Sequence, residues 1–246
     1  MAKLNMIILQ NVDSTNNYAM ELIQKNSITS GTGVFALHQT DGKGRRGKGW
    51  KAMPGQNILL STVTEMTWQP VSEQFQLSVA VALACRNFIS TYVNERVCVK
   101  WPNDIFIDDS KAAGVLIENV IKGTLWQWAV IGTGININQD EFEEVDANVT
   151  SLKKQTGKEY DVLKLAEDLK TAILQQIKNL KEGKFDQMLL EYNQHLYAKD
   201  QLVKLKKGNV VFETTIHSVS ASGQLITSDV MERQFSFDEV TFRGLV

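Results

Sequence analysis

The segment from Glu73 to Tyr92 is apolar and alanine-rich, and its twelve residues from Gln74 to Cys85 carry no charge. This composition predicts a helix that is buried in the core. Twelve uncharged residues are too few to cross a bilayer as a helix, so a membrane span is excluded here. A chain of 246 residues around such a helix has room for one large domain, or for a medium domain with a small companion.

Short β-type runs lie on both sides of this segment. A cluster of N-cap residue types, from Asp13 to Asn17, predicts a helix that continues to about Gln24. Strands mixed with helices, some as hairpin-like neighbours, predict an α/β (α+β) fold with a mixed or antiparallel sheet. The expected strands are 6–9, 34–38, 57–64, 97–99, 104–107, 114–119 and 126–137.

The pattern changes after about Ala198. Before it, apolar residues recur at spacings of three and four from Val162 to Leu180, which predicts an amphipathic helix, and a second helix is expected at 185–196. After it, four or five short β-type runs alternate with turns over about 48 residues. We therefore expect a main domain at 1–197 and a small C-terminal β-barrel at 198–246.

The net charge of the chain is too small to attract the whole protein electrostatically to nucleic acid or to a membrane. The 26 basic and 28 acidic residues give a formal net charge of −2, so any anion-binding site must be local. The two cysteines, Cys85 and Cys98, lie in apolar stretches and are expected to be core residues in a reducing compartment. The N-terminus lacks the features of a secretory signal, so a cytoplasmic protein is expected.

The segment 41–51, DGKGRRGKGWK, combines five cations with four glycines. Glycine lets backbone N–H groups approach an anion, and arginine adds forked donors, so the segment predicts a loop that orders around an anionic ligand. Three alternatives stay open. The segment could be a solvated surface loop, or a weak dinucleotide motif, weak because it leads into a strand rather than a helix. It could also follow a nucleic-acid backbone.

Three other stretches could contribute to a site. In Lys100-Trp101-Pro102-Asn103-Asp104, the Asp104 carboxylate could orient a ligand or hold a metal, and the alternative is a strand corner with Trp101 in the core. Lys111 precedes two alanines and a glycine, where backbone and one charge can approach a ligand, unless it is an ordinary hairpin lysine. The run 132–138, GTGININ, suits a base or phosphate contact, or simply ends a strand.

Taken in order, these motifs resemble the biotin–protein ligase family. The resemblance covers roughly residues 9 to 138, and the tail resembles the small C-terminal barrel of that family. It implies a catalytic domain similar to those of class II aminoacyl-tRNA synthetases and lipoate ligases. The motifs that carry it are Ser14-Thr15-Asn16, Gln39 with Gly42-Lys43-Gly44-Arg45-Arg46-Gly47, Lys100-Trp101-Pro102-Asn103-Asp104, Lys111-Ala112-Ala113-Gly114 and Gly134-Ile135-Asn136.

The resemblance implies an ATP-dependent ligase that converts biotin and MgATP to biotinyl-5′-AMP and pyrophosphate. Biotin would then pass to a lysine of the biotin carboxyl carrier protein domain of a biotin-dependent carboxylase. Because the motifs begin at Ser14, we expect a monofunctional form without the N-terminal helix-turn-helix repressor domain, binding neither DNA nor membrane. A homodimer is left open. The alternatives are a lipoate or octanoate ligase of the same fold, and a non-catalytic adenylate or nucleic-acid binder.

The resemblance also implies a role for individual residues. Lys111 and Arg45 would be catalytic, since cations relieve the repulsion when a carboxylate attacks the α-phosphate of ATP. Asp104 is the candidate ligand for Mg²⁺. The residues implied to bind biotin are Ser14, Thr15, Asn16, Gln39, Lys43, Gly44, Arg45 and Lys111. Those implied to bind the nucleotide are Arg45, Arg46, Trp50, Asn103 and Asn136.

Overall fold

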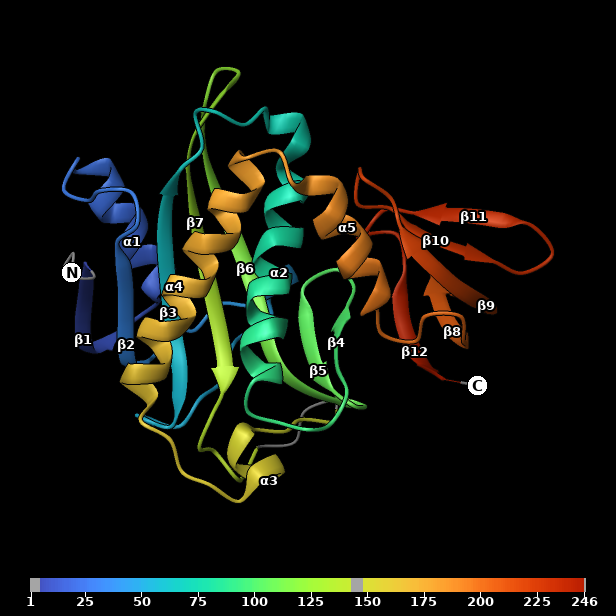
Figure 1. Cartoon of the computed structure of the whole chain (residues 1–246), viewed down its shortest axis with the longest axis horizontal. Helices are drawn as coiled ribbons and strands as arrows, with labels where there is room; N and C mark the ends of the chain where they lie inside the picture. Colours follow the sequence, from blue (N-terminus) through green and yellow to red (C-terminus); the bar gives the residue numbers. More distant parts are fainter. Residues whose placement is uncertain (1–4, 143–147, 246) are drawn as a thin grey trace.

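The structure is a computed structural model that describes residues 5–142 and 148–245, without the side chain of Arg46. It contains a seven-stranded sheet with helices on both faces and a separate five-stranded sheet formed by the C-terminal residues (Figure 1). The predicted α/β fold class with a mixed sheet is therefore confirmed. In the described part of the chain, no helix has the length and apolar character that a membrane crossing requires.

The large sheet has the strand order β1-β2-β3-β7-β6-β5-β4. Strands β1 and β2 pair in parallel through a crossover helix, and every other neighbouring pair is antiparallel. The strands are β1 (Met6–Val12), β2 (Gly33–Gln39), β3 (Asn57–Glu65), β4 (Val97–Lys100), β5 (Asp104–Ile107), β6 (Ser110–Lys122) and β7 (Leu125–Asn136). All of the strands predicted before residue 140 are present, most of them longer than expected.

Helices cover the two faces of this sheet differently. Figure 1 shows α2 and α4 side by side across one face, while α1 packs with Val34, Val63 and Val130 on the other. Successive strand residues point to opposite faces, so Phe35 joins the core under α2 and α4 instead. The helices are α1 (Thr15–Gln24), α2 (Gln74–Ser90), α3 (Leu152–Thr156), α4 (Val162–Lys181) and α5 (Phe185–Gln194), with 3₁₀ turns η1 (Arg45–Gly47) and η2 (Val71–Glu73).

The buried helix predicted from the apolar segment is α2. Its apolar side chains from Leu77 to Cys85 are at most 2% exposed, because the sheet covers one side of the helix while α4 and α5 cover the others. Both cysteines are buried and free, as expected. The amphipathic pattern predicted from Val162 to Leu180 corresponds to α4.

The C-terminal sheet, residues 202–245, is antiparallel with the order β11-β10-β9-β8-β12. Its edge strands β11 and β12 are not paired with each other in the described residues, so the predicted small barrel is open on one side. The strands are β8 (Leu202–Lys207), β9 (Val210–Val219), β10 (Leu225–Ser228), β11 (Glu232–Phe235) and β12 (Thr241–Leu245).

The two sheets meet at Lys100 and Trp101. The indole Nε1 of Trp101 donates to the carbonyl oxygen of Gly223 at 3.0 Å. The ammonium of Lys100 lies 4.3 Å from the ring centre of Phe242 on β12 and 5.3 Å from that of Tyr197. Burial lowers the pKa of Lys100. The faces of the aromatic rings attract the buried ammonium and so stabilise its charged form. Trp101 therefore belongs to an interface between the sheets rather than to the ligand site.

We expect Trp101→Phe to lower the free energy of unfolding by about 1–2 kcal/mol, because it removes a hydrogen bond that leaves the Gly223 carbonyl unpaired. Chemical denaturation measures the change. Trp68→Phe is the matched control, since its indole also donates to a backbone carbonyl, that of Glu65, but within one local turn. An equal or smaller loss for Trp101→Phe than for Trp68→Phe would contradict the assigned role of Trp101.

Candidate functional site

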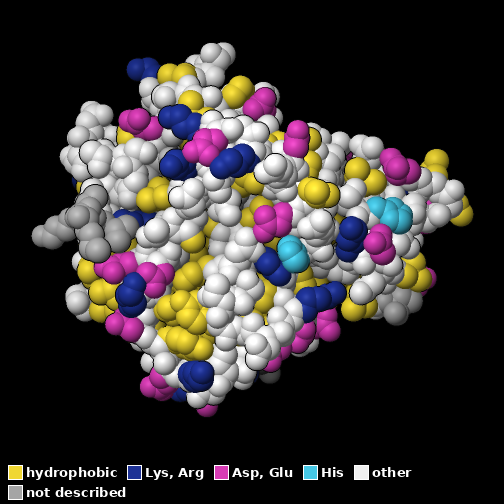
Figure 2. All heavy atoms as spheres, in the orientation of Figure 1, with side chains coloured by type: hydrophobic (Ala, Val, Ile, Leu, Met, Phe, Trp, Pro, Cys, Tyr) yellow, Lys and Arg dark blue, Asp and Glu magenta, His cyan; other side chains and the backbone are white. Residues whose placement is uncertain are grey.

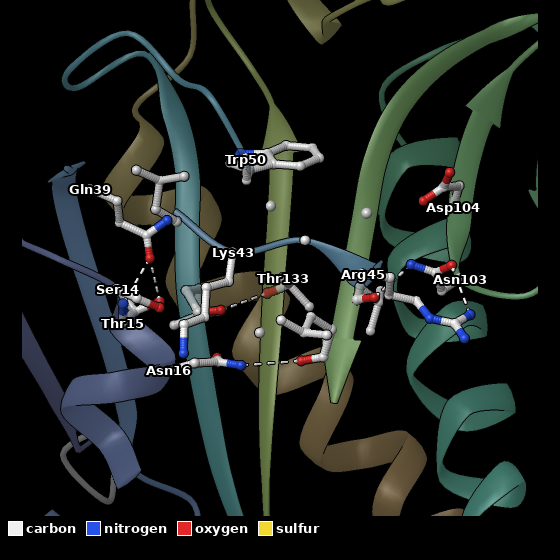
Figure 3. A pocket seen from close by; sticks show the side chains of 18 of the residues that line it. Ser14, Thr15, Asn16, Gln39, Lys43, Arg45, Trp50, Asn103, Asp104 and Thr133 are labelled. Atoms are coloured by element: carbon white, nitrogen blue, oxygen red, sulfur yellow. Dashed lines mark hydrogen bonds between the residues drawn. The ribbon is translucent and has the colours of Figure 1, made fainter. Parts of the chain in front are cut away.

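A cavity of about 60 Å³ lies on the face of the large sheet that carries α1. Figure 3 shows its lining side chains converging from the start of α1, the end of β2, the glycine-rich loop (residues 41–51) and strands β5 to β7. The predicted site residues that line it are Ser14, Thr15, Asn16, Gln39, Lys43, Gly44, Arg45, Trp50, Asn103, Asp104 and Lys111. Two further predicted residues are absent from this lining.

Arg46 and Asn136 are the two predicted residues not placed in the cavity. The side chain of Arg46 lies outside the described residues. Asn136, at the end of β7, is 3% exposed, and its Nδ2 donates to the carbonyl oxygen of Thr150 at 3.0 Å. Its amide therefore connects β7 to the segment before α3. A contact between Asn136 and a nucleotide stays a prediction.

At one end of the cavity, Gln39 is held in one orientation by Thr15. The backbone N–H and the hydroxyl of Thr15 both donate to Oε1 of Gln39, at 2.7 and 3.0 Å. Because a backbone N–H can only donate, the oxygen of Gln39 must face α1. Figure 3 accordingly shows the amide nitrogen of Gln39 turned towards the cavity. The side chain of Ser14, the N-cap residue, makes no capping hydrogen bond.

The side-chain amide of Asn16 has the opposite orientation to that of Gln39, because here the protein binds the amide nitrogen. Its Nδ2 donates to Oε2 of Glu118 at 2.7 Å and more weakly to the carbonyl oxygen of Leu116 at 3.4 Å. A carbonyl and a carboxylate accept, so the nitrogen of Asn16 faces β6 and its oxygen receives the hydroxyl of Ser61 on β3. The cavity is thus lined by a fixed amide donor from Gln39 and a fixed amide acceptor from Asn16.

Three glycines form the floor of the cavity and permit close approach. A Cβ on Gly132 would lie 2.6 Å from Oδ1 of Asn16, and one on Gly134 would lie 2.4 Å from the indole of Trp50. The Trp50 ring also crowds Gly114, where a Cβ would be 3.1 Å from it. No side chain other than hydrogen fits beneath these groups without displacing them. The indole Nε1 of Trp50 is buried and has no hydrogen-bond partner in the described part of the chain.

At the other end, Lys111 forms an ion pair with Asp104, with 2.9 Å between Nζ and Oδ1. The pairing of β5 with β6 shifts by one residue here, since Ile105 pairs with Ala113 while Phe106 pairs with Lys111. The resulting bulge turns Lys111 to the same face as the glycine floor, which is a known use of bulges near sites. Its backbone is fixed by hydrogen bonds with residues 148 and 150.

The glycine-rich loop is closed over the cavity. Trp50 N donates to the carbonyl oxygen of Gly42 at 2.7 Å, which joins the two ends of the loop. Near its middle, Nη1 of Arg45 donates to Oδ1 of Asn103 at 3.3 Å. About 60 Å³ remains beneath the loop, whereas pockets for small organic ligands are typically about 300–1,000 Å³, so we expect the loop to move outwards when a ligand enters.

The site offers few ligands for a metal. In the residues that the structure describes, no three His, Cys, Asp or Glu side chains are grouped to hold an ion. Mg²⁺ commonly keeps several waters and is bound by one or two carboxylates together with substrate phosphates. Asp104 fits that arrangement as a single carboxylate beside an anionic substrate, but its observed partner is Lys111.

Sequence reasoning missed Ser61, Glu118, Phe237 and Asp238. Ser61 is fully buried directly after the apolar run from Ile58 to Leu60 of β3, and such a polar residue in a buried strand is a usable signal. Glu118 ends an apolar run on β6 and has no distinguishing local feature. Phe237 and Asp238 are far away in sequence from the other site residues, and both contact Arg45.

Comparison with known proteins places this geometry in context. Residues 8–136 match the model of the "Biotin/lipoate A/B protein ligase family". The bifunctional ligase/repressor BirA of Escherichia coli is 33% identical over 141 residues, which are 57% of this chain and 43% of that protein. The biotin–[acetyl-CoA-carboxylase] ligase of Mycobacterium tuberculosis is 32% identical over 148 residues, covering 59% and 53% respectively. The chain therefore spans about half the length of these curated relatives.

A solved structure extends the likeness of the fold to the whole chain. The biotin protein ligase of Aquifex aeolicus, in complex with biotin and ATP, superposes with a TM-score of 0.83 over 98% of this chain and 99% of that one, at 24% identity. The similarity includes the C-terminal sheet. This match establishes the fold of the chain.

Proposed function

Because the chain belongs to the biotin/lipoate A/B protein ligase family, we propose that it is a biotin–protein ligase. It activates biotin with ATP and transfers it to a lysine of a biotin carboxyl carrier protein domain. The biotin–[acetyl-CoA-carboxylase] ligase similar to this chain supports that choice of acceptor. We further propose that residues 1–197 form the catalytic domain and 198–246 the second domain, and that the protein acts in the cytoplasm.

The observation that carries the proposal is the fixed polarity of Gln39 and Asn16. Gln39 presents N–H donors, and the Asn16 oxygen can accept a second hydrogen bond beside that from Ser61, so the pocket suits one group that both accepts and donates. The ureido ring of biotin has a carbonyl acceptor between two N–H donors. The dithiolane of lipoate and the chain of octanoate have neither the N–H groups nor the ureido carbonyl, and they would leave the amide N–H of Gln39 without an acceptor from the ligand. A site that is built to hydrogen-bond a polar group of its ligand strongly rejects analogues that lack this group.

Activation joins two anions, and the cations at the far end of the cavity serve this step. An oxygen of the biotin carboxylate attacks the α-phosphorus of ATP, the new C–O–P linkage forms, and the bond to the β-phosphate breaks to release pyrophosphate. Lys111 and Arg45 neutralise the charge that develops in the transition state. Asp104 holds the Lys111 ammonium in place. Mg²⁺, carried with ATP, would supply additional charge neutralisation at the phosphates.

Transfer then moves the acyl group to an amine. The carrier lysine, as the free amine, attacks the acyl carbon, an amide forms with loss of a proton, and AMP leaves. The adenylate is a mixed anhydride that water destroys, so the closed glycine-rich loop protects it between the two steps. On the face shown in Figure 2, which α2 and α4 cover, basic and acidic side chains are interspersed.

ATP–pyrophosphate exchange tests the proposal without a carrier protein. Biotin, lipoate and octanoate are offered separately with MgATP, and exchange is expected with biotin alone. Exchange with lipoate or octanoate instead would keep the family and overturn the substrate. Exchange with none of the three acids would favour a non-catalytic adenylate binder.

We expect Glu118→Gln to weaken biotin binding by roughly tenfold, about 1.4 kcal/mol. Glutamine can donate, so Asn16 is no longer compelled to turn its oxygen towards Ser61 and the ligand. Titration calorimetry with biotin measures this, and ATP affinity should be unchanged. Glu213→Gln, an exposed carboxylate on β9, is the control. Unchanged biotin affinity in Glu118→Gln would contradict the assigned orientation of Asn16.

A further inference from the structure

The C-terminal sheet reaches the glycine-rich loop through the turn between β11 and β12. The guanidinium of Arg45 lies over the ring of Phe237, 4.6 Å from its centre, and Nη2 of Arg45 is 3.9 Å from Oδ1 of Asp238. Phe237 and Asp238 also line a second cavity of about 510 Å³, whose other walls are the glycine-rich loop, Leu116 and Glu118. A segment distant in sequence therefore borders the outer side of the loop.

The turn that carries these two residues is internally fixed. The carboxylate of Glu239 accepts from the backbone N–H of Ser236 at 2.8 Å and forms an ion pair with Lys207 at 3.2 Å. The hydrogen bond from Ser236, followed by Lys207, lowers the pKa of Glu239. Val240 is buried beneath the turn. Phe237 and Asp238 are thus presented from a built turn.

Arg45 is held from both sheets at once. Asn103, in the turn between β4 and β5, accepts from one terminal nitrogen, and Asp238, in the turn between β11 and β12, faces the other. The interface at Lys100 and Trp101, which joins the two sheets, lies just before Asn103 in the same motif. Lys100 and Trp101 contact the C-terminal sheet, whereas Asn103 and Asp104 face the cavity.

We propose that Phe237 and Asp238 are positioning residues that keep the glycine-rich loop closed through Arg45, and so determine how long the acyl-adenylate is retained. This inference rests on the proposed function and assigns the C-terminal sheet a task in it. The loop needs such support, because its cations repel one another and its glycines lose more backbone entropy on ordering than other residues do. The ring face of Phe237 and the carboxylate of Asp238 both attract the guanidinium of Arg45. This attraction offsets part of the repulsion and of the entropy cost.

Trypsin measures loop opening without any enzymatic activity, since the loop offers cleavage sites after Lys43, Arg45, Arg46, Lys48 and Lys51. We expect cleavage within residues 43–51 to be about two- to fivefold faster in Phe237→Ala and in Asp238→Asn. Phe237→Tyr keeps the ring face and should be cleaved as slowly as wild type. Glu232→Gln, an exposed change on β11, is the control. Fragment masses locate the first cut, and thermal unfolding confirms that each variant is folded.

The second measurement is the amount of biotinyl-adenylate released into solution for each biotin transferred. It is expected to rise in Phe237→Ala and Asp238→Asn by a similar factor, with Phe237→Tyr unchanged. Wild-type cleavage rates in both variants would overturn the proposal. Faster cleavage with unchanged adenylate retention would also overturn it, since the contact would then be structural only. If the wild-type chain makes no adenylate, the proposed function fails, whereas the trypsin result still decides whether these residues hold the loop.

Discussion

Lys111→Ala is expected to lower the rate of adenylate synthesis by at least about a hundredfold, corresponding to about 3 kcal/mol of lost transition-state stabilisation. The ammonium is the cation fixed at the reacting end of the cavity, and its removal leaves the Asp104 carboxylate, 2.9 Å from Nζ, uncompensated beside two anionic substrates. The fold should survive, because Lys111 is held in β6 by backbone bonds that alanine retains. Pyrophosphate exchange at saturating biotin and ATP measures the effect.

Two further variants separate the charge of Lys111 from its place in the fold. Lys122→Ala, an exposed change on the same strand, should leave exchange unaltered. The double variant Lys111→Ala with Asp104→Asn should recover part of the lost rate, because the unpaired carboxylate that repels the substrates is gone. Near wild-type exchange in Lys111→Ala would remove this residue from the reaction.

Gly132→Ala is expected to abolish most biotin binding, on the order of a hundredfold, and to lower the free energy of unfolding by about 1–3 kcal/mol. The added Cβ would lie 2.6 Å from Oδ1 and 3.1 Å from Cγ of Asn16, which is 3% exposed and bonded to Ser61 and Glu118. The amide cannot move aside without losing those partners. Calorimetry with biotin and chemical denaturation measure the two effects.

A double-mutant cycle with Asn16→Ala isolates this clash. In the Asn16→Ala background, Gly132→Ala has room for its methyl group, so its cost in unfolding free energy should largely disappear. Additive costs of the two substitutions would show that the destabilisation arises elsewhere in β7.

The strands, the buried helix and the glycine-rich loop could be predicted because each depends on a local pattern. The apolar run of α2 and the spacing of Val162 to Leu180 determine burial within a single element. The lining residues of the cavity were predicted by resemblance to a family, since the identity of Gln39 alone does not indicate which way its amide points.

What the sequence could not provide are the partners that orient those residues. Asn16 and Glu118 are 102 residues apart, and Arg45 meets Phe237 across almost the whole chain. Such pairs depend on strand register, on the bulge at Lys111 and on the docking of the two sheets. None of these leaves a periodic signal in one segment.

The position of the glycine-rich loop over the cavity has a kinetic consequence. We expect capture of a bicyclic acid to wait for the loop to open, so that the opening rate limits binding at high ligand concentration. Observed association rates should therefore rise with biotin at first and then level off at a plateau equal to the opening rate. The loop closure that shields a hydrolysable intermediate thus also limits the rate of substrate uptake. A variant whose loop opens faster would bind biotin faster, but it would also lose more of the adenylate to water.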